Sequence, residues 1–590
     1  MTSNLHMDHA ALLIESLYTA GVRDAVVSPG SRSTPLVLAL ANEPRIATRV
    51  CIDERSAAFF ALGISSYTHR PTLLVCTSGT AAAHYLPAII EASLTGIPLI
   101  MLTADRPWDA YDCAAPQTID QVKLYANYVR HYAELGLPEV TTLAAVQRIA
   151  AHAVSVSLGD HPGPVHLNAR FRKPLEPVAH VGEPPYARSL GLARARTTHV
   201  FAAPKAPHEI VLSLAHLLAE YPDGVIACGP SVGSDRLAPH VVALARATGY
   251  PVLAESTSDV RMGCDPAVSL SAIEPALRSE RWRTEPPSVV IEVGLPMVST
   301  AYAQWLSGHA HKLAARIVVT PWGHPDPSGS ATHLLVGAVA ETLAALTAAR
   351  TEKSRTTSEP TWRSRWLAAQ SRANAHLVEA SQPTLLTELS ALDVLLKSLG
   401  PTSALLVGNS SVVRDIDLVA PASAPVRVLH QRGASGIDGL IARAAGSRAA
   451  QRDGVLALVL GDVAFWHDVG SLQTLSAVDQ PLVVLVLNNH GGRIFDRLPI
   501  AKDSSLREDF SKYFVTAPVH SIARVAEAFG VRVDTVSTHT ALVEALSRAQ
   551  AHQGPTVLEV DCTPGSAERF ASLVASTANA MDARPTGAPL

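Results

Sequence analysis

VLALVLGDV at residues 455–463 and LVVLVLNNHGG at residues 482–492 are the two segments that indicate the fold of this chain most clearly. Each apolar run has the length and composition of a strand buried on both faces of a parallel sheet. Asp462 and Asn489 therefore stand where two buried strands end. Carboxylate and amide oxygens suit a hard divalent cation such as Mg²⁺, which keeps a phosphate in its remaining coordination positions. We therefore expect these strand ends to hold a diphosphate through a cation.

Length and composition indicate a large globular protein. A chain of 590 residues is too long for one core and predicts about three or four domains. Hydrophobic residues make up 47% and charged residues 17%, which supplies enough apolar material for large buried sheets. The net charge of −4, with scattered basic residues, argues against a nucleic-acid partner. No stretch has the pattern of a secretion signal or a membrane span, so we expect a cytoplasmic protein.

Short apolar runs alternate with longer amphipathic stretches in three blocks, each of which predicts a parallel α/β sheet. We predict domains at 1–185, 208–350 and 385–575, linkers at 186–207 and 351–384, and a tail at 576–590.

Polar residues follow three strands of the first block. The predicted strands at 24–28, 73–76 and 97–103 lead into Pro29-Gly30, Ser78-Gly79 and Ala104-Asp105. An open parallel sheet binds its ligands at this carboxyl edge, so we expect part of the site there. No Gly-x-Gly-x-x-Gly follows the strands of the middle block, and we interpret that block as structural.

The Gly461-Asp462-Val463 and Asn488-Asn489 elements together resemble the signature of thiamine diphosphate (ThDP) enzymes. That resemblance implies three doubly wound parallel-sheet α/β domains: pyrimidine-binding, central and diphosphate-binding. It also implies a catalytic glutamate against the aminopyrimidine ring, and Glu54 fits because it stands between a short strand and an apolar helix. A carboxylate at a helix start can also serve only the helix dipole. The ThDP signature in the same chain favours the catalytic role.

Five motifs indicate one particular family of ThDP enzymes. They are SPGSRSTPL at 28–36, TSGTA at 77–81, LTADRP at 102–107, RGASGIDG at 432–439 and NNHGGRIF at 488–495. Together they resemble the MenD family, the 2-succinyl-5-enolpyruvyl-6-hydroxy-3-cyclohexene-1-carboxylate synthases of menaquinone biosynthesis. The resemblance implies a transferase that uses ThDP with Mg²⁺ or Mn²⁺. Its reaction is the decarboxylation of 2-oxoglutarate and the 1,4-addition of the succinyl unit to isochorismate, with Glu54 activating the cofactor.

The resemblance also assigns residues to roles. Cofactor binding falls to Glu54, Thr77, Ser78, Gly79, Asn409, Ser410, Gly436, Ile437, Gly461, Asp462, Val463, Asn489, Gly491, Gly492 and Ile494. The metal ligands are Asp462, Asn489 and the Gly491 carbonyl. Substrate binding falls to Ser31, Arg32, Arg106, Gln117, Asn409, Ser410, Arg414, Arg432, Ile494, Phe495 and Leu498. Ile437 would be the apolar wedge that bends the cofactor, with an ordinary core role as the alternative.

The arginines indicate a substrate with carboxylates independently of the resemblance. Each of Arg32, Arg106, Arg414 and Arg432 stands beside Gly or Ser or at a predicted strand end. A guanidinium binds a carboxylate through two parallel hydrogen bonds, so four such arginines favour a substrate pair with several carboxylates. A single arginine would more simply be an exposed surface residue.

The sequence departs from the family at two places. Pro116 stands where some relatives carry Asn, and no basic residue follows Gly294-Leu295-Pro296 in the middle block. Because Glu54 and Asp462 fall in different predicted domains, the resemblance implies an active site between two subunits of a homodimer or homotetramer. The alternatives are another ThDP-dependent 2-oxoacid decarboxylase or carboligase, such as an acetolactate synthase-like enzyme, and an inactive ThDP-binding relative.

Overall fold

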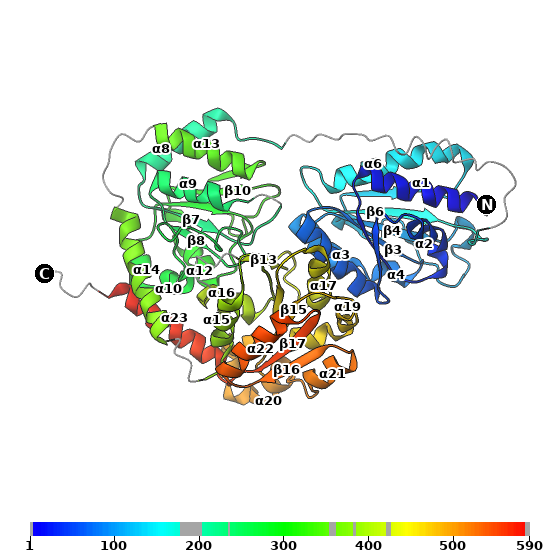
Figure 1. The fold of residues 1–590 in the computed structure, drawn as a ribbon. Helices are drawn as coiled ribbons and strands as arrows, with labels where there is room; N and C mark the ends of the chain where they lie inside the picture. Colours follow the sequence, from blue (N-terminus) through cyan, green and yellow to red (C-terminus); the bar gives the residue numbers. More distant parts are fainter. Residues whose placement is uncertain are drawn as a thin grey trace, which may run out of the picture. The chain divides into compact units, whose positions relative to one another are not determined.

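The computed structural model describes residues 4–177, 203–233, 236–352, 361–380, 385–419 and 426–583. Two compact units make up the chain. Unit 1 contains residues 1–202, 431–452 and 467–479, and unit 2 contains residues 203–430, 453–466 and 480–590. The predicted third domain thus contributes residues to both units. Figure 1 shows three sheets, and each consists only of parallel strands. The predicted α/β fold with three parallel sheets is therefore confirmed.

The sheet of unit 1 has six strands in the order β2-β1-β3-β4-β6-β5. The strands are β1 (Asp24–Val27), β2 (Ala47–Val50), β3 (Thr72–Cys76), β4 (Leu99–Asp105), β5 (His131–Glu134) and β6 (Pro164–Arg170). The helices are α1 (Leu5–Ala20), α2 (Thr34–Ala41), α3 (Glu54–Thr68), α4 (Thr80–Ala83), α5 (Leu86–Thr95), α6 (Leu143–Ser157), α17 (Leu440–Ala450) and α19 (Leu472–Leu475). One apolar core joins the sheet to α1, α2 and α6.

Helix α17 packs directly on α3 within unit 1, and two glycines make this close contact possible. A Cβ atom at Gly63 would lie 2.2 Å from the Arg443 carbonyl oxygen, and one at Gly446 would lie 1.9 Å from the Phe60 carbonyl oxygen. Larger side chains at these positions would force the two backbones apart. The glycines therefore fix how α17 sits on the helix that begins with Glu54.

The second sheet, in unit 2, has the strand order β11-β10-β9-β7-β8. Its strands are β7 (Gly224–Cys228), β8 (Val252–Ala254), β9 (Val289–Val293), β10 (Ala315–Thr320) and β11 (His333–Val336). The helices are α8 (His208–Glu220), α9 (Ala238–Thr248), α10 (Ile273–Arg278), α11 (Glu280–Thr284), α12 (Thr300–His309), α13 (Val339–Glu352) and α14 (Thr361–Ala380). Separate apolar cores cover the two faces, as a doubly wound sheet requires.

The third sheet, also in unit 2, has the order β13-β12-β14-β15-β17-β16. Its strands are β12 (Ala404–Val407), β13 (Arg427–His430), β14 (Leu456–Gly461), β15 (Leu482–Asn488), β16 (Arg532–Val536) and β17 (Pro555–Asp561). The helices are α15 (Glu388–Ser398), α16 (Ser411–Val419), α18 (Asp462–His467), α20 (Arg507–Phe510), α21 (Ile522–Ala528), α22 (His539–Ala551) and α23 (Ser566–Asp582). Helices α15, α16 and α22 share one apolar core with the sheet.

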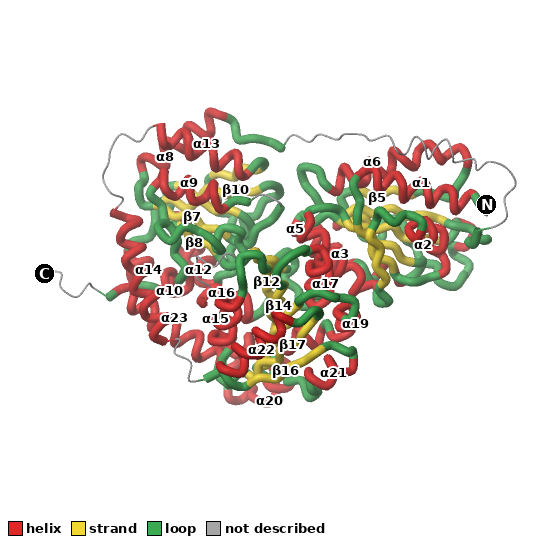
Figure 2. Tube along the Cα trace, in the orientation of Figure 1, coloured by secondary structure: helices red, strands yellow, loops and turns green. Residues whose placement is uncertain are grey.

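The predicted linkers and tail lie partly outside the described residues. Of the linker at 186–207, residues 186–202 are outside, as are residues 584–590 of the tail. The segment 351–384 contains helix α14, which lies beside α23 (Figure 2). The domain boundaries stay a prediction. Each helix in the described ranges falls short of the length or the apolar character that a bilayer-spanning helix needs.

Candidate active site

The strands β14 and β15, which precede Asp462 and Asn489, are neighbours in the third sheet. β14 and β15 pair in parallel register, with Gly461 opposite Leu487. Asp462 is the first residue of α18, and Asn489 follows the last residue of β15. Because parallel neighbours end at the same edge of a sheet, the predicted metal ligands come from adjacent strand ends, as the sequence indicated.

The Asp462 carboxylate is buried and held by backbone amides. Gly491 N donates to its Oδ2 at 2.7 Å, and Val463 N donates to its Oδ1 at 2.9 Å. Burial raises the pKa of this carboxyl, and the amides of Gly491 and Val463 oppose that shift. A cation at this carboxylate would add a further opposite charge and favour the ionised form.

The side chain of Asn489 is oriented by a buried glutamate. Its Nδ2 donates to Oε1 of Glu388 at 3.0 Å. Glu388 is the first residue of α15, and Arg569 lies 3.4 Å from its other oxygen. The bond to Glu388 uses the amide nitrogen of Asn489 and leaves the amide oxygen for a cation. No sequence pattern indicated Glu388, which stands about a hundred residues before its partner.

Gly461 leaves open space beside these ligands, and Gly491 allows a close backbone contact. A Cβ atom built on Gly461 meets no atom within 4 Å. Gly491 has a φ of +118°, and a Cβ atom there would lie 2.3 Å from the Val515 carbonyl oxygen. The donors are a carboxylate, an amide oxygen and a backbone carbonyl, which are hard ligands. The residues present therefore fit Mg²⁺ or Mn²⁺ with a diphosphate.

The predicted substrate residues Asn409, Ser410 and Arg414 follow β12 in the same sheet. Asn409 is buried, and Ser410 has a φ of +70°, which is uncommon for a residue with a side chain. The Arg414 guanidinium donates to the Ser410 carbonyl at 2.7 Å. Burial lowers the pKa of Arg414, and the neighbouring charge of Arg497 lowers it further. The Arg497 guanidinium is itself paired with Asp415 Oδ1 at 3.0 Å, and the charges of Glu255, Glu274 and Asp415 oppose the pKa shift of Arg414.

An apolar segment follows the metal ligands. Ile494 and Phe495 lie in the short helix η7 (Arg493–Arg497), and Leu498 caps it. Phe495 and Leu498 are exposed for side chains of their size. The Phe495 ring packs edge-on against Phe514, with the ring centres 5.6 Å apart. Exposed apolar groups after the metal ligands agree with the predicted contact to cofactor and substrate.

In unit 1, the loops after β1 and β3 touch each other. Arg32 N donates to the Thr77 hydroxyl at 3.3 Å, and a Cβ atom at Gly30 would lie 2.3 Å from the Thr77 Cβ. The Ser78 hydroxyl donates to the Gln117 carbonyl at 2.9 Å. Gln117 has a φ of +53°, so this loop holds an uncommon backbone conformation. The structure thus brings Arg32, Thr77, Ser78 and Gln117 to one edge, as predicted.

Two guanidiniums at this edge have unused donors. Arg32 is buried and donates to the Phe171 carbonyl at 2.8 Å. Its Nε and the Nε of Arg106 are buried without a hydrogen-bond partner among the described residues. Burial lowers the pKa of Arg32, with a further lowering from the nearby charge of Arg106. Unpaired buried donors and two positive charges together favour a bound carboxylate.

Glu54 opens α3 at the same end of the sheet. Asp53 caps the helix by accepting from Arg55 N at 2.9 Å. Burial raises the pKa of the Cys76 thiol to about 12, and the charge of Glu54 adds to this shift. Glu54 therefore lies near the end of β3, where the Thr77-Ser78-Gly79 loop begins. The prediction that Glu54 stands at a strand-to-helix junction is confirmed.

A buried hydrogen-bond network fixes the start of α3. The Arg55 guanidinium donates to Asp468 Oδ1 at 2.9 Å, and the hydroxyls of Ser56 and Ser471 lie 2.8 Å apart. Asp468 also accepts from Ile441 N at 2.8 Å, which caps α17. The residues flanking Glu54 are thereby tied to the helix that follows the RGASGIDG motif. No sequence pattern indicated Asp468.

The RGASGIDG motif forms a loop at 432–439 that packs on α3 and α5. A Cβ atom at Gly439 would lie 2.0 Å from the Phe59 ring. The Gln431 side chain donates to the carbonyls of Gly436 and Asp438 at 3.3 and 2.8 Å. The predicted wedge Ile437 is half-buried within this loop. The loop and Glu54 belong to the same unit of the chain.

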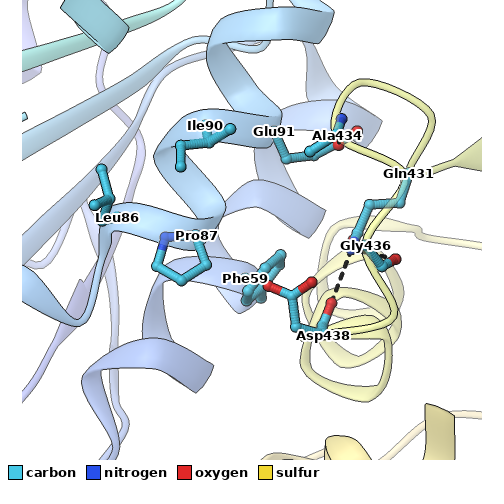
Figure 3. Close-up of a pocket in the computed structure, with 9 residues that line it drawn as sticks. All are labelled: Phe59, Leu86, Pro87, Ile90, Glu91, Gln431, Ala434, Gly436 and Asp438. Carbon is cyan, nitrogen blue, oxygen red and sulfur yellow. Dashed lines mark hydrogen bonds between the residues drawn. The ribbon is translucent and has the colours of Figure 1, made fainter.

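A pocket of about 240 Å³ lies between this loop and helices α3 and α5 (Figure 3). Its lining residues are Phe59, Leu86, Pro87, Ile90, Glu91, Gln431, Ala434, Gly436 and Asp438. None of them except Gly436 is a predicted site residue. The pocket therefore borders the loop that carries Arg432 and Ile437.

The predicted site residues fall into two groups. Unit 1 holds Ser31, Arg32, Glu54, Thr77, Ser78, Gly79, Arg106, Gln117, Arg432, Gly436 and Ile437. Unit 2 holds Asn409, Ser410, Arg414, Gly461, Asp462, Val463, Asn489, Gly491, Gly492, Ile494, Phe495 and Leu498. The Ser31 side chain is exposed, and its carbonyl accepts from the Thr34 hydroxyl. The functional roles of these residues stay predictions.

Comparisons with known proteins identify relatives of this chain over most of its length. Residues 7–124 match the family model of the thiamine pyrophosphate enzyme N-terminal TPP binding domain, and residues 410–560 match that of the C-terminal TPP binding domain. A 2-succinyl-5-enolpyruvyl-6-hydroxy-3-cyclohexene-1-carboxylate synthase from Sorangium cellulosum is 42% identical, with 95% of this chain and 94% of the relative covered. Synthases of the same name from Roseiflexus castenholzii and Myxococcus xanthus are 35% and 38% identical, over 99% and 92% of this chain and 100% and 92% of the relatives.

The fold also matches a solved structure. A proposed thiamin diphosphate-dependent enzyme from Mycobacterium smegmatis aligns with a TM-score of 0.70. The alignment covers 94% of this chain and 99% of that protein, at 19% identity. At this identity the likeness supports the fold alone.

Proposed function

Because this chain belongs to the 2-succinyl-5-enolpyruvyl-6-hydroxy-3-cyclohexene-1-carboxylate synthase family, we propose that it catalyses the reaction in that name. The substrates would be 2-oxoglutarate and isochorismate. The products would be the cyclohexene carboxylate and CO₂, in a transferase step of menaquinone biosynthesis. The proposed cofactors are ThDP and Mg²⁺ or Mn²⁺, in agreement with the two TPP binding domains.

When bound, ThDP supplies an electron sink that allows a 2-oxoacid to lose CO₂ and its former keto carbon to form a new bond. The chain's own residues would bind and orient the reactants. Asp462, the Asn489 amide oxygen and the Gly491 carbonyl would hold the cation and its diphosphate. Glu54 would hold a proton against the pyrimidine ring, and its neighbours Asp53 and Arg55 keep it in place.

The side chains of Arg32, which is buried, and Arg106, which is half-buried, indicate which substrate the site prefers. Arg32 and Arg106 approach each other at the edge of the unit 1 sheet, and both keep an unpaired buried Nε. An apolar 2-oxoacid would leave these donors without partners, which is costly in a buried site. A substrate with a second carboxylate would satisfy them. This observation favours a dicarboxylic oxoacid over the pyruvate of acetolactate synthase-like enzymes.

A direct comparison of substrates tests this proposal. The protein, loaded with ThDP and Mg²⁺, is incubated with 2-oxoglutarate or with pyruvate, and CO₂ release is measured with and without isochorismate. We expect release from 2-oxoglutarate that depends on Glu54, so that Glu54→Gln abolishes it. Turnover of pyruvate alone would assign the chain to another ThDP reaction, and release from neither substrate would indicate an inactive relative.

We also propose a homodimer, or a homotetramer built from such dimers, with each active site formed from two subunits. Mixing of two inactive variants tests it. If Glu54 of one subunit works with Asp462 of its partner, a mixture of Glu54→Gln and Asp462→Ala subunits that re-equilibrate regains about a quarter of the native activity. The reason is that half of the dimers are mixed and each has one intact site. A site formed within a single subunit would regain none.

A cytoplasmic location is the remaining part of this proposal. It is in keeping with the six cysteines, all of which are free in the structure, as is usual in a reducing compartment. Fractionation of cells with a cytoplasmic marker enzyme tests it, and recovery of the protein with the membranes would contradict it.

A further inference from the structure

Glu91 is a buried carboxylate that none of the predicted roles explains. It lies in α5, its side chain is 1% exposed, and it borders the pocket of Figure 3. Its Oε1 accepts from Gly433 N at 3.0 Å, and its Oε2 accepts from Ala434 N at 2.7 Å. One carboxylate thus binds two consecutive backbone amides of the 432–439 loop. An ionised acceptor makes such bonds stronger than a neutral one does.

The fit between the loop and α5 leaves little freedom at this point. A Cβ atom at Gly433 would lie 2.9 Å from Leu94 Cβ, 2.9 Å from Thr95 Cγ2 and 3.0 Å from Glu91 Oε2. Any other residue at position 433 would push the loop off the helix. The missing side chain therefore allows the amides to reach the carboxylate.

The other charges near Glu91 come from the same segment of chain. The Arg443 guanidinium, in the helix that follows the loop, lies 3.8 Å from Glu91 Oε1, and both side chains are about 2% exposed. Burial raises the pKa of Glu91, and Arg443, the two amides and the more distant Arg432 oppose that shift. The carboxylate thus faces positive groups from the loop and from α17.

Other side chains also hold the 432–439 loop and the helix that follows it. The Gln431 side chain donates to two carbonyls of the loop, and Asp468 caps the helix that follows it. Between these two fixed points, Glu91 is the side chain that holds Gly433 and Ala434. These residues directly follow Arg432, and Ile437 lies three residues further on.

We propose that Glu91 is a positioning residue: by binding the Gly433 and Ala434 amides, it sets the places of Arg432 toward substrate and of Ile437 toward the cofactor. This inference rests on the proposed function. Glu91 touches neither reactant in this account and acts only through the loop.

Hydrogen exchange of the full-length protein tests the proposal independently of turnover. The variants are Glu91→Leu, which cannot accept a hydrogen bond, and Glu91→Gln, which keeps one acceptor oxygen. The control is Glu43→Gln, another buried carboxylate of unit 1, whose oxygens bond Arg45 just before the amino end of β2. We expect amide exchange in peptides covering 431–439 to rise about 10- to 100-fold in Glu91→Leu and about tenfold in Glu91→Gln. Peptides elsewhere, and the 431–439 peptides of the control, should exchange at the native rate.

Binding and kinetics supply the second readout. We expect the Kd for ThDP, measured by calorimetry, and the KM for 2-oxoglutarate to rise about tenfold in Glu91→Gln and to stay native in Glu43→Gln. Unchanged exchange at 431–439 in both Glu91 variants would overturn the proposal. So would faster exchange with native affinities, because the loop would then be held without effect on the site. If the native protein turned over no 2-oxoglutarate, the proposed function would fail, whereas exchange and ThDP affinity would still report on the loop.

Discussion

Replacement of Glu388 tests how the metal ligands are arranged. Glu388 is buried and accepts from Nδ2 of Asn489 at 3.0 Å, which leaves the amide oxygen for the cation. Leucine has nearly the same volume but accepts no hydrogen bond, so in Glu388→Leu the amide of Asn489 loses its orientation. Loss of a partner that orients a metal ligand costs about 10- to 100-fold in metal affinity. A single hydrogen bond to a charged group, worth about 1.5–3 kcal/mol, gives a similar range.

The assay is the binding of Mn²⁺ in the presence of ThDP, followed by electron paramagnetic resonance of the free ion. We expect the Kd for Mn²⁺ to rise about 10- to 100-fold in Glu388→Leu. Glu388→Gln should lose only a few-fold because its amide oxygen still accepts. The control is Arg569→Met, which removes the neighbour at 3.4 Å and keeps the bond to Asn489. Native Mn²⁺ affinity in Glu388→Leu would show that Glu388 does not orient the metal ligand Asn489.

Three further predictions concern unit 1. Arg32→Met should raise the KM for 2-oxoglutarate about 10- to 100-fold and leave ThDP affinity native, because a buried guanidinium that binds a carboxylate is lost; a native KM in steady-state kinetics would count against a carboxylate at this edge. Asp468→Asn should lower the free energy of unfolding by about 1–3 kcal/mol, because Arg55 and the first amides of α17 lose a charged acceptor. Urea titrations followed by circular dichroism measure this change. The kcat should fall as well, and an unchanged kcat would show that this network does not position Glu54. Burial lowers the pKa of His9 to about 4. The unfolded chain binds this proton at a pKa near 6.5, so stability falls as the pH drops from about 6.5 to 4, by about 2 kcal/mol at pH 5; His9→Gln should remove this part of the pH dependence, and an equal loss in both proteins would contradict it.

The sequence predicted well those features that depend on local pattern. The runs that became β14 and β15 are apolar throughout because both sheet faces are covered, and polar residues begin where each strand ends. The start of α3 at Glu54 could be predicted for the same reason, since an apolar helix follows a polar turn. Motifs around these points then identified the cofactor family.

Residues that act across long sequence separations were not predicted. Glu388, Asp468 and Glu91 each bind a backbone or side-chain group far away in the chain, and no periodic pattern marks them. One sequence feature does mark Glu91: it is the only charged residue in the apolar run from Leu86 to Ala92. A charge in such a run is costly to bury without partners, so it indicates a specific contact but not which one. The helix at 361–380 lies in a segment that was predicted as a linker. Charged residues are scattered along this helix, so its sequence does not show clearly the face on which Trp362 and Trp366 are buried.

The reaction proposed for this chain joins 2-oxoglutarate to isochorismate. Its most direct test is mass spectrometry of the product formed from 2-oxoglutarate labelled with ¹³C at every carbon and unlabelled isochorismate, with ThDP and Mg²⁺ present. We expect a product that carries four labelled carbons, with the fifth released as labelled CO₂. Labelled CO₂ without a product derived from isochorismate, or no reaction at all, would contradict it.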